Sequence, residues 1–383
     1  MARKKTRRQT RRERRSLRET SRKDESNTSL AEDSTKRHSR DKGKRKETTP
    51  TVSVEEKTRH SCETITTENP TQQEKRKPKP PKPVPPAVEK AVADFMKFTT
   101  ETAGVEGLRQ ECKIVLDCKP NPGTYTKFEA LPQFNRYPEV PCLDETRIKV
   151  QPIDEGDNDY IHANRVKMEN CEREYILTQG PKANTIEDFW KMVFQQQCPG
   201  VVMLCNFYEE GVQACEEFWP TEAGAYKYYG KMFVNNKRVD HLDQYDVYVL
   251  EILPDGCSNS ILTRLAHCNT WPKKAVPSSG RMVLRLIRWT QSLEPGPVTV
   301  LCSAGVGRTG TFIAIDFACT RLFKGFDGNI KDIVLAIRRQ RAYSIHNELQ
   351  YFFVYSTVLD YIRAKISKYH KQVSKFYAEL TKV

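Results

Sequence analysis

The first part of the chain lacks aromatic residues, since no Phe, Trp or Tyr occurs before Phe95. Residues 1–80 instead hold 25 Lys and Arg against 13 Asp and Glu, which accounts for +12 of the chain's net charge of +14. A segment of this composition has too few apolar side chains to bury a core. We therefore expect a disordered basic tail over residues 1–88, closed by the stiff Pro-rich spacer KPKPPKPVPPAVEK.

Long apolar runs and metal-site spacings are also missing. The opening MARKKTRRQTRRERRSLRET has no hydrophobic stretch behind its charges, as a secretory signal requires. No later run approaches the roughly 18 apolar residues of a membrane span. The 12 cysteines include no C-x-x-C pair and no Cys/His cluster at zinc spacing. We expect reduced thiols in a cytoplasmic or nuclear protein, with neither a metal nor a cofactor.

The basic tail leaves three roles open. It is a solvated linker, a nuclear localisation signal that binds an importin, or an electrostatic contact from residues 1–80 to nucleic acid or an anionic membrane. Because no aromatic side chain is present there for bases to stack on, the composition argues against base-specific reading. The sequence does not set the oligomeric state.

From about residue 90 the pattern changes to that of a folded domain. In TIEDFWKMVFQQQ, apolar residues recur at helical spacing from Ile186 to Phe194. GVVMLCNF and VTVL indicate strands buried on both faces, and QYDVYVLEIL indicates a strand with one wet face. GRMVLRLIRWTQSL, TGTFIAIDFACTRLF and NIKDIVLAIRRQ predict helices. Strands alternating with helices predict one contiguous α/β domain at residues 89–383.

The segment VTVLCSAGVGRTG holds the residues suited to chemistry. A buried strand ends at Leu301, Cys302 follows, two glycines allow a sharp turn, and a helix is expected from about Thr309. Backbone N–H groups of such a loop converge at the helix N-terminus, where they bind an anion and stabilise a thiolate. Arg308 can give a phosphate two parallel hydrogen bonds. The arrangement suits phosphoryl transfer from an ester to sulfur.

CSAGVGRTG resembles the signature loop of the protein tyrosine phosphatases, and other blocks extend this resemblance from about residue 90 to the C-terminus. FNRYPEVPCLDETRIKV resembles the phosphotyrosine-recognition loop, and NDYIHANRV, YILTQGP, DFWKMV and GVQACEEFWP resemble framework blocks. HCNTWPKKAVPSS resembles the mobile loop with the general acid, and RRQRAYSIHNELQYFFVY resembles the segment with the water-positioning glutamine. The resemblance implies a twisted mixed sheet flanked by helices, with the phosphate loop at the base of a deep pocket.

The resemblance also implies a two-step reaction. A cysteine thiolate attacks phosphorus while an aspartic acid protonates the leaving oxygen, and water oriented by a glutamine then hydrolyses the phosphocysteine. Cys302, Arg308 and Thr309 match the nucleophile, the phosphate clamp and the hydroxyl that helps the thiolate leave. The residues that match substrate-binding positions are Tyr137, Glu139, Ser303, Ala304, Gly305, Val306, Gly307, Arg308 and Gln350.

Three positions depart from the family pattern. Leu301 stands where a histidine helps hold the loop and favours the thiolate. Lys273 replaces the general acid, in a WPKKAVP stretch without any acidic residue, and His346 stands where the glutamine is expected. An ordinary lysine, with a pKa near 10.4, is a poor proton donor at neutral pH. Losing a positioned acid or base costs roughly 10²–10⁴ in rate.

These departures predict a pseudophosphatase that binds phosphotyrosine in a partner protein without efficient turnover. One alternative is a slow phosphatase that uses Cys302 and Arg308 while solvent or His346 supplies protons. Another is a scaffold that acts mainly through its basic tail. For His346 itself, a purely structural role is favoured over a catalytic one.

Overall fold

The computed structural model describes residues 83–153, 156 and 158–381. Nearly all of the predicted basic tail, with the partners expected for residues 1–80, lies outside the described residues. Helix α1 (Pro86–Lys97) begins before the domain boundary expected at residue 89, because proline at the first helical position has its φ preset for a helix. The described residues contain no helix long and apolar enough to cross a membrane.

A mixed sheet is the centre of the fold, and within the described residues it has nine strands in the order β1-β2-β3-β11-β4-β10-β9-β8-β7. Strands β3, β11, β4 and β10 run parallel, and the remaining neighbours are antiparallel. The strands are β1 (Arg147–Lys149), β2 (Tyr160–Val166), β3 (Tyr175–Gln179), β4 (Gly200–Met203), β7 (Tyr226–Tyr229), β8 (Met232–His241), β9 (Asp246–Pro254), β10 (Ile261–His267) and β11 (Val298–Cys302). A separate hairpin pairs β5 (Tyr208–Glu209) with β6 (Val212–Gln213).

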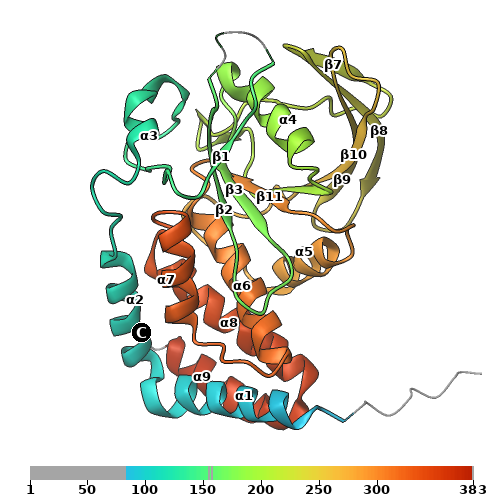
Figure 1. The fold of residues 1–383 in the computed structure, drawn as a ribbon. Helices are drawn as coiled ribbons and strands as arrows, with labels where there is room; N and C mark the ends of the chain where they lie inside the picture. The colour runs from blue at the N-terminus through green and yellow to red at the C-terminus, as the bar shows by residue number, and fades with distance from the viewer. Residues whose placement is uncertain (1–82, 154–155, 157, 382–383) are drawn as a thin grey trace, which may run out of the picture. The chain divides into compact units, whose positions relative to one another are not determined.

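Helices lie on both faces of this sheet (Figure 1). Helix α4 (Ile186–Gln195) packs against β8 and β9, whereas α6 (Gly307–Phe323) packs against β3, β11, α7 (Ile330–Gln340) and α8 (Glu348–Lys365). The remaining helices of the described residues are η1 (Phe98–Ala103), α2 (Gly104–Asp117), α3 (Thr126–Ala130), η2 (Pro132–Phe134), η3 (Ala183–Thr185), α5 (Arg281–Gln291), η4 (Ser367–Tyr369) and α9 (His370–Leu380).

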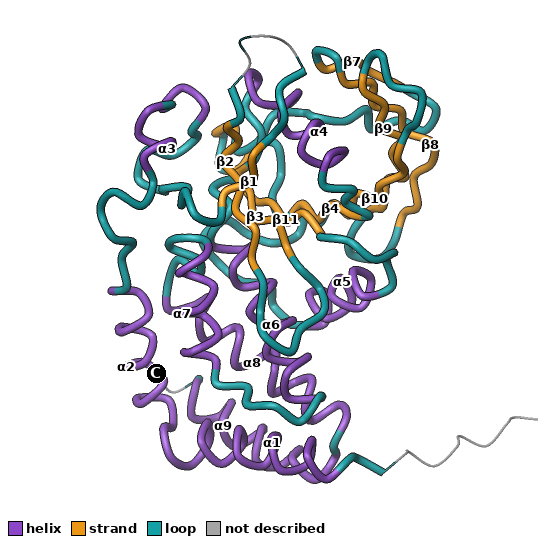
Figure 2. The backbone as a smooth tube through the Cα atoms, viewed as in Figure 1, coloured by secondary structure: helices purple, strands orange, loops and turns teal. Residues whose placement is uncertain are grey.

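The predicted fold class is confirmed, and most predicted elements are found at their expected places. Phe189, Trp190 and Val193 form the buried face of α4, as the spacing indicates. Strands β4 and β11 are buried along their whole length, as expected for the parallel centre of a sheet. The alternation of strands and helices is interrupted by β7, β8, β9 and β10. These four strands follow one another along the chain, and each pairs antiparallel with the next (Figure 2).

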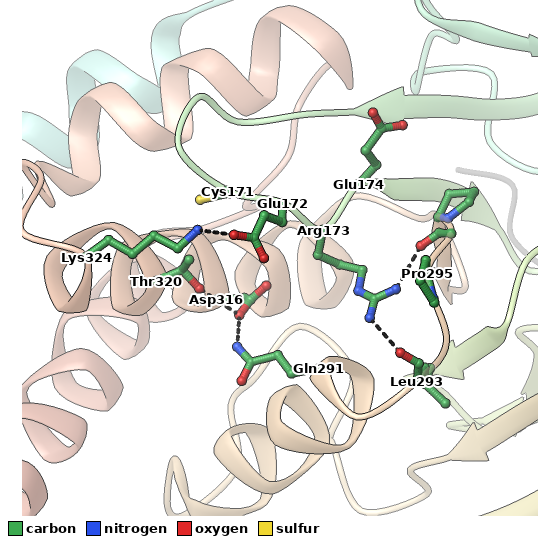
Figure 3. A pocket seen from close by; sticks show the side chains of 12 residues that line it. Cys171, Glu172, Arg173, Glu174, Gln291, Leu293, Pro295, Asp316, Thr320 and Lys324 are labelled. Carbon is green, nitrogen blue, oxygen red and sulfur yellow. Dashed lines mark hydrogen bonds and ion pairs between the residues drawn. The ribbon is translucent and has the colours of Figure 1, made fainter.

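At the N-terminal ends of β3 and β11, a hollow of about 630 Å³ is lined by polar side chains that already have partners (Figure 3). The buried carboxylate of Asp316 accepts hydrogen bonds from Tyr175, Gln291 and Thr320. Burial raises the pKa of Asp316, although these donors lower it in part. With its polar groups satisfied, the hollow is part of the framework.

Arg173 fastens the segment after α5 to the start of β3. Its guanidinium donates hydrogen bonds to four carbonyl oxygens, which belong to Thr290, Leu293, Glu294 and Gly296, over distances of 2.9 to 3.1 Å. One acceptor, the carbonyl of Thr290, lies in the last turn of α5, where helix carbonyls lack partners within the helix. One side chain therefore holds the approach to β11, the strand that ends at Cys302.

We expect Arg173→Met to lower the free energy of unfolding by about 1–3 kcal/mol, because several carbonyls lose their donor. Urea unfolding would measure the change. Lys167→Met is the matched control, since Lys167 is 60% exposed and only pairs with Glu174 at the surface. Equal effects from the two substitutions would contradict the role given to Arg173.

Candidate functional site

The loop 303–306 connects the end of β11 to the start of α6. Strand β11 lies between β3 and β4 in the parallel part of the sheet, so its last residue, Cys302, reaches the C-terminal edge. Gly305 adopts φ +67° in this loop, and a Cβ there would lie 2.2 Å from the carbonyl oxygen of Thr178. The close approach of the loop to β3 therefore requires glycine.

Arg341 orients the same loop from beneath. Its fully buried guanidinium donates to the carbonyl oxygens of Gly305 at 3.0 Å and Ala304 at 3.2 Å. It also donates to Asn164 Oδ1 at 2.8 Å and to His162 Nδ1 at 3.1 Å. In a trans peptide the N–H points away from the C=O of the same peptide group. The N–H groups of Gly305 and Val306 therefore point away from Arg341. They face outward at the N-terminus of α6, an arrangement that can bind an anion.

Cys302 lies at the floor of this cradle and is 3% exposed. Its sulfur is 4.0 Å from Oγ1 of Thr309, a buried residue in the first turn of α6. A hydroxyl at this position can donate to a thiolate, and the helix N-terminus stabilises negative charge on sulfur. The structure thus brings the predicted nucleophile and its predicted hydroxyl partner together.

Arg308 is held by a carboxylate that the sequence did not identify. Its two terminal nitrogens donate to both oxygens of Glu209, with Nη2 2.8 Å from Oε2, and Nη1 also donates to the carbonyl oxygen of Trp271 at 3.1 Å. Burial disfavours the charged guanidinium, but the hydrogen bond to Glu209 and the negative charges of Cys302, Cys205 and Glu209 together outweigh it and raise the pKa of Arg308. The edge formed by Nε and Nη2 has no further partner among the described residues. A phosphate can bind there through two parallel hydrogen bonds.

Tyr137 forms a side wall next to the loop. Its hydroxyl lies 2.7 Å from Oγ of Ser303, and that oxygen donates to the carbonyl of Ala214 at 2.9 Å. Glu139, two residues after Tyr137, is exposed. The predicted wall residue therefore contacts the loop directly, while Glu139 is free to meet a ligand outside it.

Lys273 belongs to a loop that is fastened at several points. Trp271 is buried, and the carbonyl of Lys274 accepts a hydrogen bond of 2.8 Å from Asn347 Nδ2. Nζ of Lys273 donates to Oε2 of Glu210 at 3.0 Å, in the turn of the β5–β6 hairpin. This hydrogen bond raises the pKa of Lys273. Lys273 therefore stays cationic at neutral pH.

His346 and Gln350 lie against the helix end of the loop. A Cβ at Gly307 would be 3.0 Å from Oε1 of Gln350 and 3.3 Å from Cβ of His346. The backbone N–H of His346 donates to that glutamine oxygen at 3.0 Å. Partial burial lowers the pKa of His346, and the charge of Lys274 lowers it further. The imidazole is therefore neutral at pH 7.

Comparison with known proteins decides the family. The Protein-tyrosine phosphatase family profile matches residues 132–360, which is more than half of the chain. The chain belongs to the protein-tyrosine phosphatase family. The resemblance found in the sequence is thereby confirmed.

Three relatives illustrate the similarity of this phosphatase domain. The chain is 35% identical over 267 residues to Tyrosine-protein phosphatase non-receptor type 2 of Homo sapiens, covering 68% of this chain and 63% of that one. It is 34% identical over 277 residues to the non-receptor type 9 enzyme of Homo sapiens, covering 67% and 45%. It is 33% identical over 293 residues to Receptor-type tyrosine-protein phosphatase zeta of Rattus norvegicus, covering 72% and 13%. The chain thus spans less than two thirds of these relatives.

Leu301, the third departure from the family pattern, is fully buried in the core of the phosphatase domain. It lies between Thr178 of β3 and Met203 of β4 in the parallel register. An apolar side chain at this position gives the loop packing but no hydrogen bond. The described residues also contain no group of three or more His, Cys, Asp or Glu that could hold a metal ion.

Sequence reasoning missed Glu209, Arg341 and His162. Glu209 lies shortly before a glycine turn, and Arg341 lies in a run of basic residues. In the sequence, neither can be distinguished from an ordinary charged residue at the surface. His162 is buried, and burial together with the charge of Arg341 lowers its pKa to about 3. The neutral ring accepts from Arg341 and donates from Nε2 to the carbonyl of Val140 at 2.8 Å.

We expect Arg341→Met to weaken binding of orthovanadate at least about tenfold, because the loop carbonyls lose the donor that turns them away from the anion. The free energy of unfolding should also fall by about 1–3 kcal/mol. Calorimetry and urea unfolding would measure the two effects. Arg339→Met, an exposed position on α7, is the control and should change neither. Unchanged orthovanadate affinity in Arg341→Met would contradict this account.

Proposed function

We propose that this phosphatase domain binds phosphotyrosine in a partner protein and that its catalysis is impaired. The observation that carries the proposal is the contrast between Arg308 and Lys273. Arg308 keeps one edge of its guanidinium available beside the N–H groups of the loop, whereas Lys273 fills the general-acid position with a cation bonded to Glu210. The groups that would bind a phosphate are present, whereas the acid expected to donate a proton is replaced by Lys273.

The available edge of Arg308 supports binding of a phosphate dianion. Glu209 fixes the guanidinium plane before any ligand arrives, so little side-chain freedom is lost when phosphate binds. Tyr137 would pack against the tyrosine ring, and Glu139 would contact the backbone of the bound peptide, as the family resemblance implies. Lys273, on the overhanging loop, adds a second cation where an ionised aspartate would repel the dianion.

We expect impaired turnover because the general-acid position of the site holds no side chain that readily donates or accepts a proton near neutral pH. A lysine whose pKa is raised above its ordinary value neither donates a proton readily nor acts as a base near neutral pH. Leu301 gives the loop no polar support. Such a site gains in ground-state binding and loses the interactions that act only in the transition state.

The second candidate function is slow hydrolysis of phosphotyrosine through a phosphocysteine intermediate. It is supported by the approach of Thr309 to Cys302 and by the neutral imidazole of His346 beside the loop. In this alternative, His346 would accept a proton from water in the second step. The partner is again a phosphotyrosine protein, and a cytoplasmic or nuclear location fits the free thiols throughout the described residues.

Arg308→Lys tests the binding step. The lysine keeps a positive charge beside Glu209 but cannot offer phosphate two parallel hydrogen bonds. We expect affinity for a phosphotyrosyl peptide, measured by calorimetry, to fall at least about tenfold. Arg281→Lys, at an exposed position, is the control and should leave affinity unchanged. If the unaltered chain releases no heat with any phosphotyrosyl peptide, the binding proposal fails.

Restoring the missing groups tests the catalytic step. Lys273→Asp would place a carboxylate beside Glu210, so it is combined with Glu210→Gln, Leu301→His and His346→Gln. We expect turnover of a phosphotyrosyl peptide to rise about 10²–10⁴-fold. Turnover of p-nitrophenyl phosphate should change less, because its leaving group needs no acid. Robust peptide turnover by the unaltered chain near pH 6–7 would instead support the active phosphatase.

A further inference from the structure

Strands β7–β10 form a half-sheet with one covered and one open face. Helix α4 packs on the covered face, whereas α5 reaches the other face only at the end near Arg264, and no helix of the described chain covers the outer side of β7 in Figures 1 and 2. Tyr226, Tyr228 and Leu262 point to the open face and are each 64% exposed. Apolar side chains that gather on one exposed face mark an interaction surface.

The strand register arranges the open face in three rows that run across the strands. Residues opposite one another in neighbouring strands share a face. The rows consist of Tyr228, Phe233 and Leu253; then Tyr226, Asn235, Glu251 and Leu262; then Arg238, Val249 and Arg264. The ring of Phe233 lies 5.2 Å from that of Tyr228 and 5.5 Å from that of Tyr226. The face is therefore aromatic at one end and basic at the other.

A hollow of about 880 Å³ lies at the basic end, between β8–β10 and the segment that follows α5. Strand β8 has a bulge between Asn236 and Arg238. In a regular strand, Lys237 and Arg238 would point to opposite faces, but with the bulge both line the hollow. The bulge therefore brings the side chains of Lys237 and Arg238 to the same end of the open face.

Of the three cations that line the hollow, one has no carboxylate partner among the described residues. Lys237 pairs with Glu251 over 2.8 Å, and Arg238 pairs with Asp240 over 2.9 Å. The side chain of Arg264 is exposed and has neither a hydrogen bond nor an ion pair within the described chain. An unbalanced cation next to a concave surface attracts an acidic side chain of a partner.

We propose that the open face and the hollow dock an extended segment of a partner protein that is apolar at one end and acidic at the other. Its apolar side chains would pack on Tyr226, Tyr228 and Phe233, and its acidic side chains would pair with Arg238 and Arg264.

Charge also favours an acidic protein segment over single-stranded nucleic acid. Bases can stack on exposed aromatic rings. However, Glu251 stands in the middle row of the face, and Asp240 lies 2.9 Å from Arg238. Both carboxylates would repel a phosphate backbone. Acidic side chains of a protein can instead be spaced to meet the cations alone.

The docking surface and the Cys302 site lie at opposite edges of the sheet. Arg264 pairs with Gly200 at the start of β4, whereas Cys302 ends the neighbouring parallel strand β11. A partner could therefore occupy both sites at once, which would raise its overall affinity without new contacts at either one. This surface acts independently of phosphotyrosine binding.

Fluorescence anisotropy of the full chain tests the proposal. The probe is a short fluorescein-labelled peptide with Phe and Leu in its first half and Glu in its second, and without tyrosine. We expect the pair Arg238→Glu and Arg264→Glu to weaken its binding at least about tenfold. Lys371→Glu with Lys375→Glu, at exposed positions on α9, changes the net charge equally and should leave binding unchanged.

A second pair, Tyr226→Ser with Tyr228→Ser, tests the aromatic end and should also weaken binding, with thermal midpoints confirming that every variant is folded. The proposal is overturned if the unaltered chain does not bind the peptide, or if both charge-reversed pairs lose it equally. It is also overturned if Arg238 and Arg264 instead support binding of oligouridine. Because the probe has no phosphotyrosine, its failure leaves the function proposed for Cys302 and Arg308 intact.

Discussion

The geometry of the phosphate site depends on one buried cation without a carboxylate partner, Arg341. Its charge is balanced by two loop carbonyls, an amide oxygen and the neutral ring of His162. Because those carbonyls are turned toward it, the loop can present only N–H groups to the opposite side. The same residue thus sets the polarity of the cradle, and an anion bound above it meets a positive charge on both sides of the loop.

Arg308 connects this cradle to the loop that arches over it. It is bonded to Glu209 of the β5–β6 hairpin and to the carbonyl of Trp271, while Lys273 is bonded to Glu210 of the same hairpin. Two consecutive glutamates therefore fasten the phosphate clamp and the overhanging loop to one short turn. The ion pair between Lys273 and Glu210 adds an attractive contact between the overhanging loop and the hairpin.

The sequence predicted the parallel half of the fold because buried strands and amphipathic helices have distinct periodicities. Cys302, Arg308 and Thr309 could be placed because the loop must join a strand to a helix with glycine between them. Glu209 and Arg341 could not, since their roles come from partners far along the chain, and a buried charge resembles a surface charge in one sequence. Of strands β7–β10, the sequence predicted β9 from the alternation in QYDVYVLEIL, whereas a bulge interrupts the alternation in β8.

The bulge in β8 also bears on how this surface can change during evolution. Asn236 pairs with Leu250 and Arg238 pairs with Val249, so consecutive positions of β9 face residues on either side of Lys237. Loss of that one residue would leave every other pair of the ladder in register, whereas a deletion elsewhere in β8 would turn buried side chains outward. At this point of the chain, a cation can be gained or lost by a single-codon insertion or deletion while the core stays as it is.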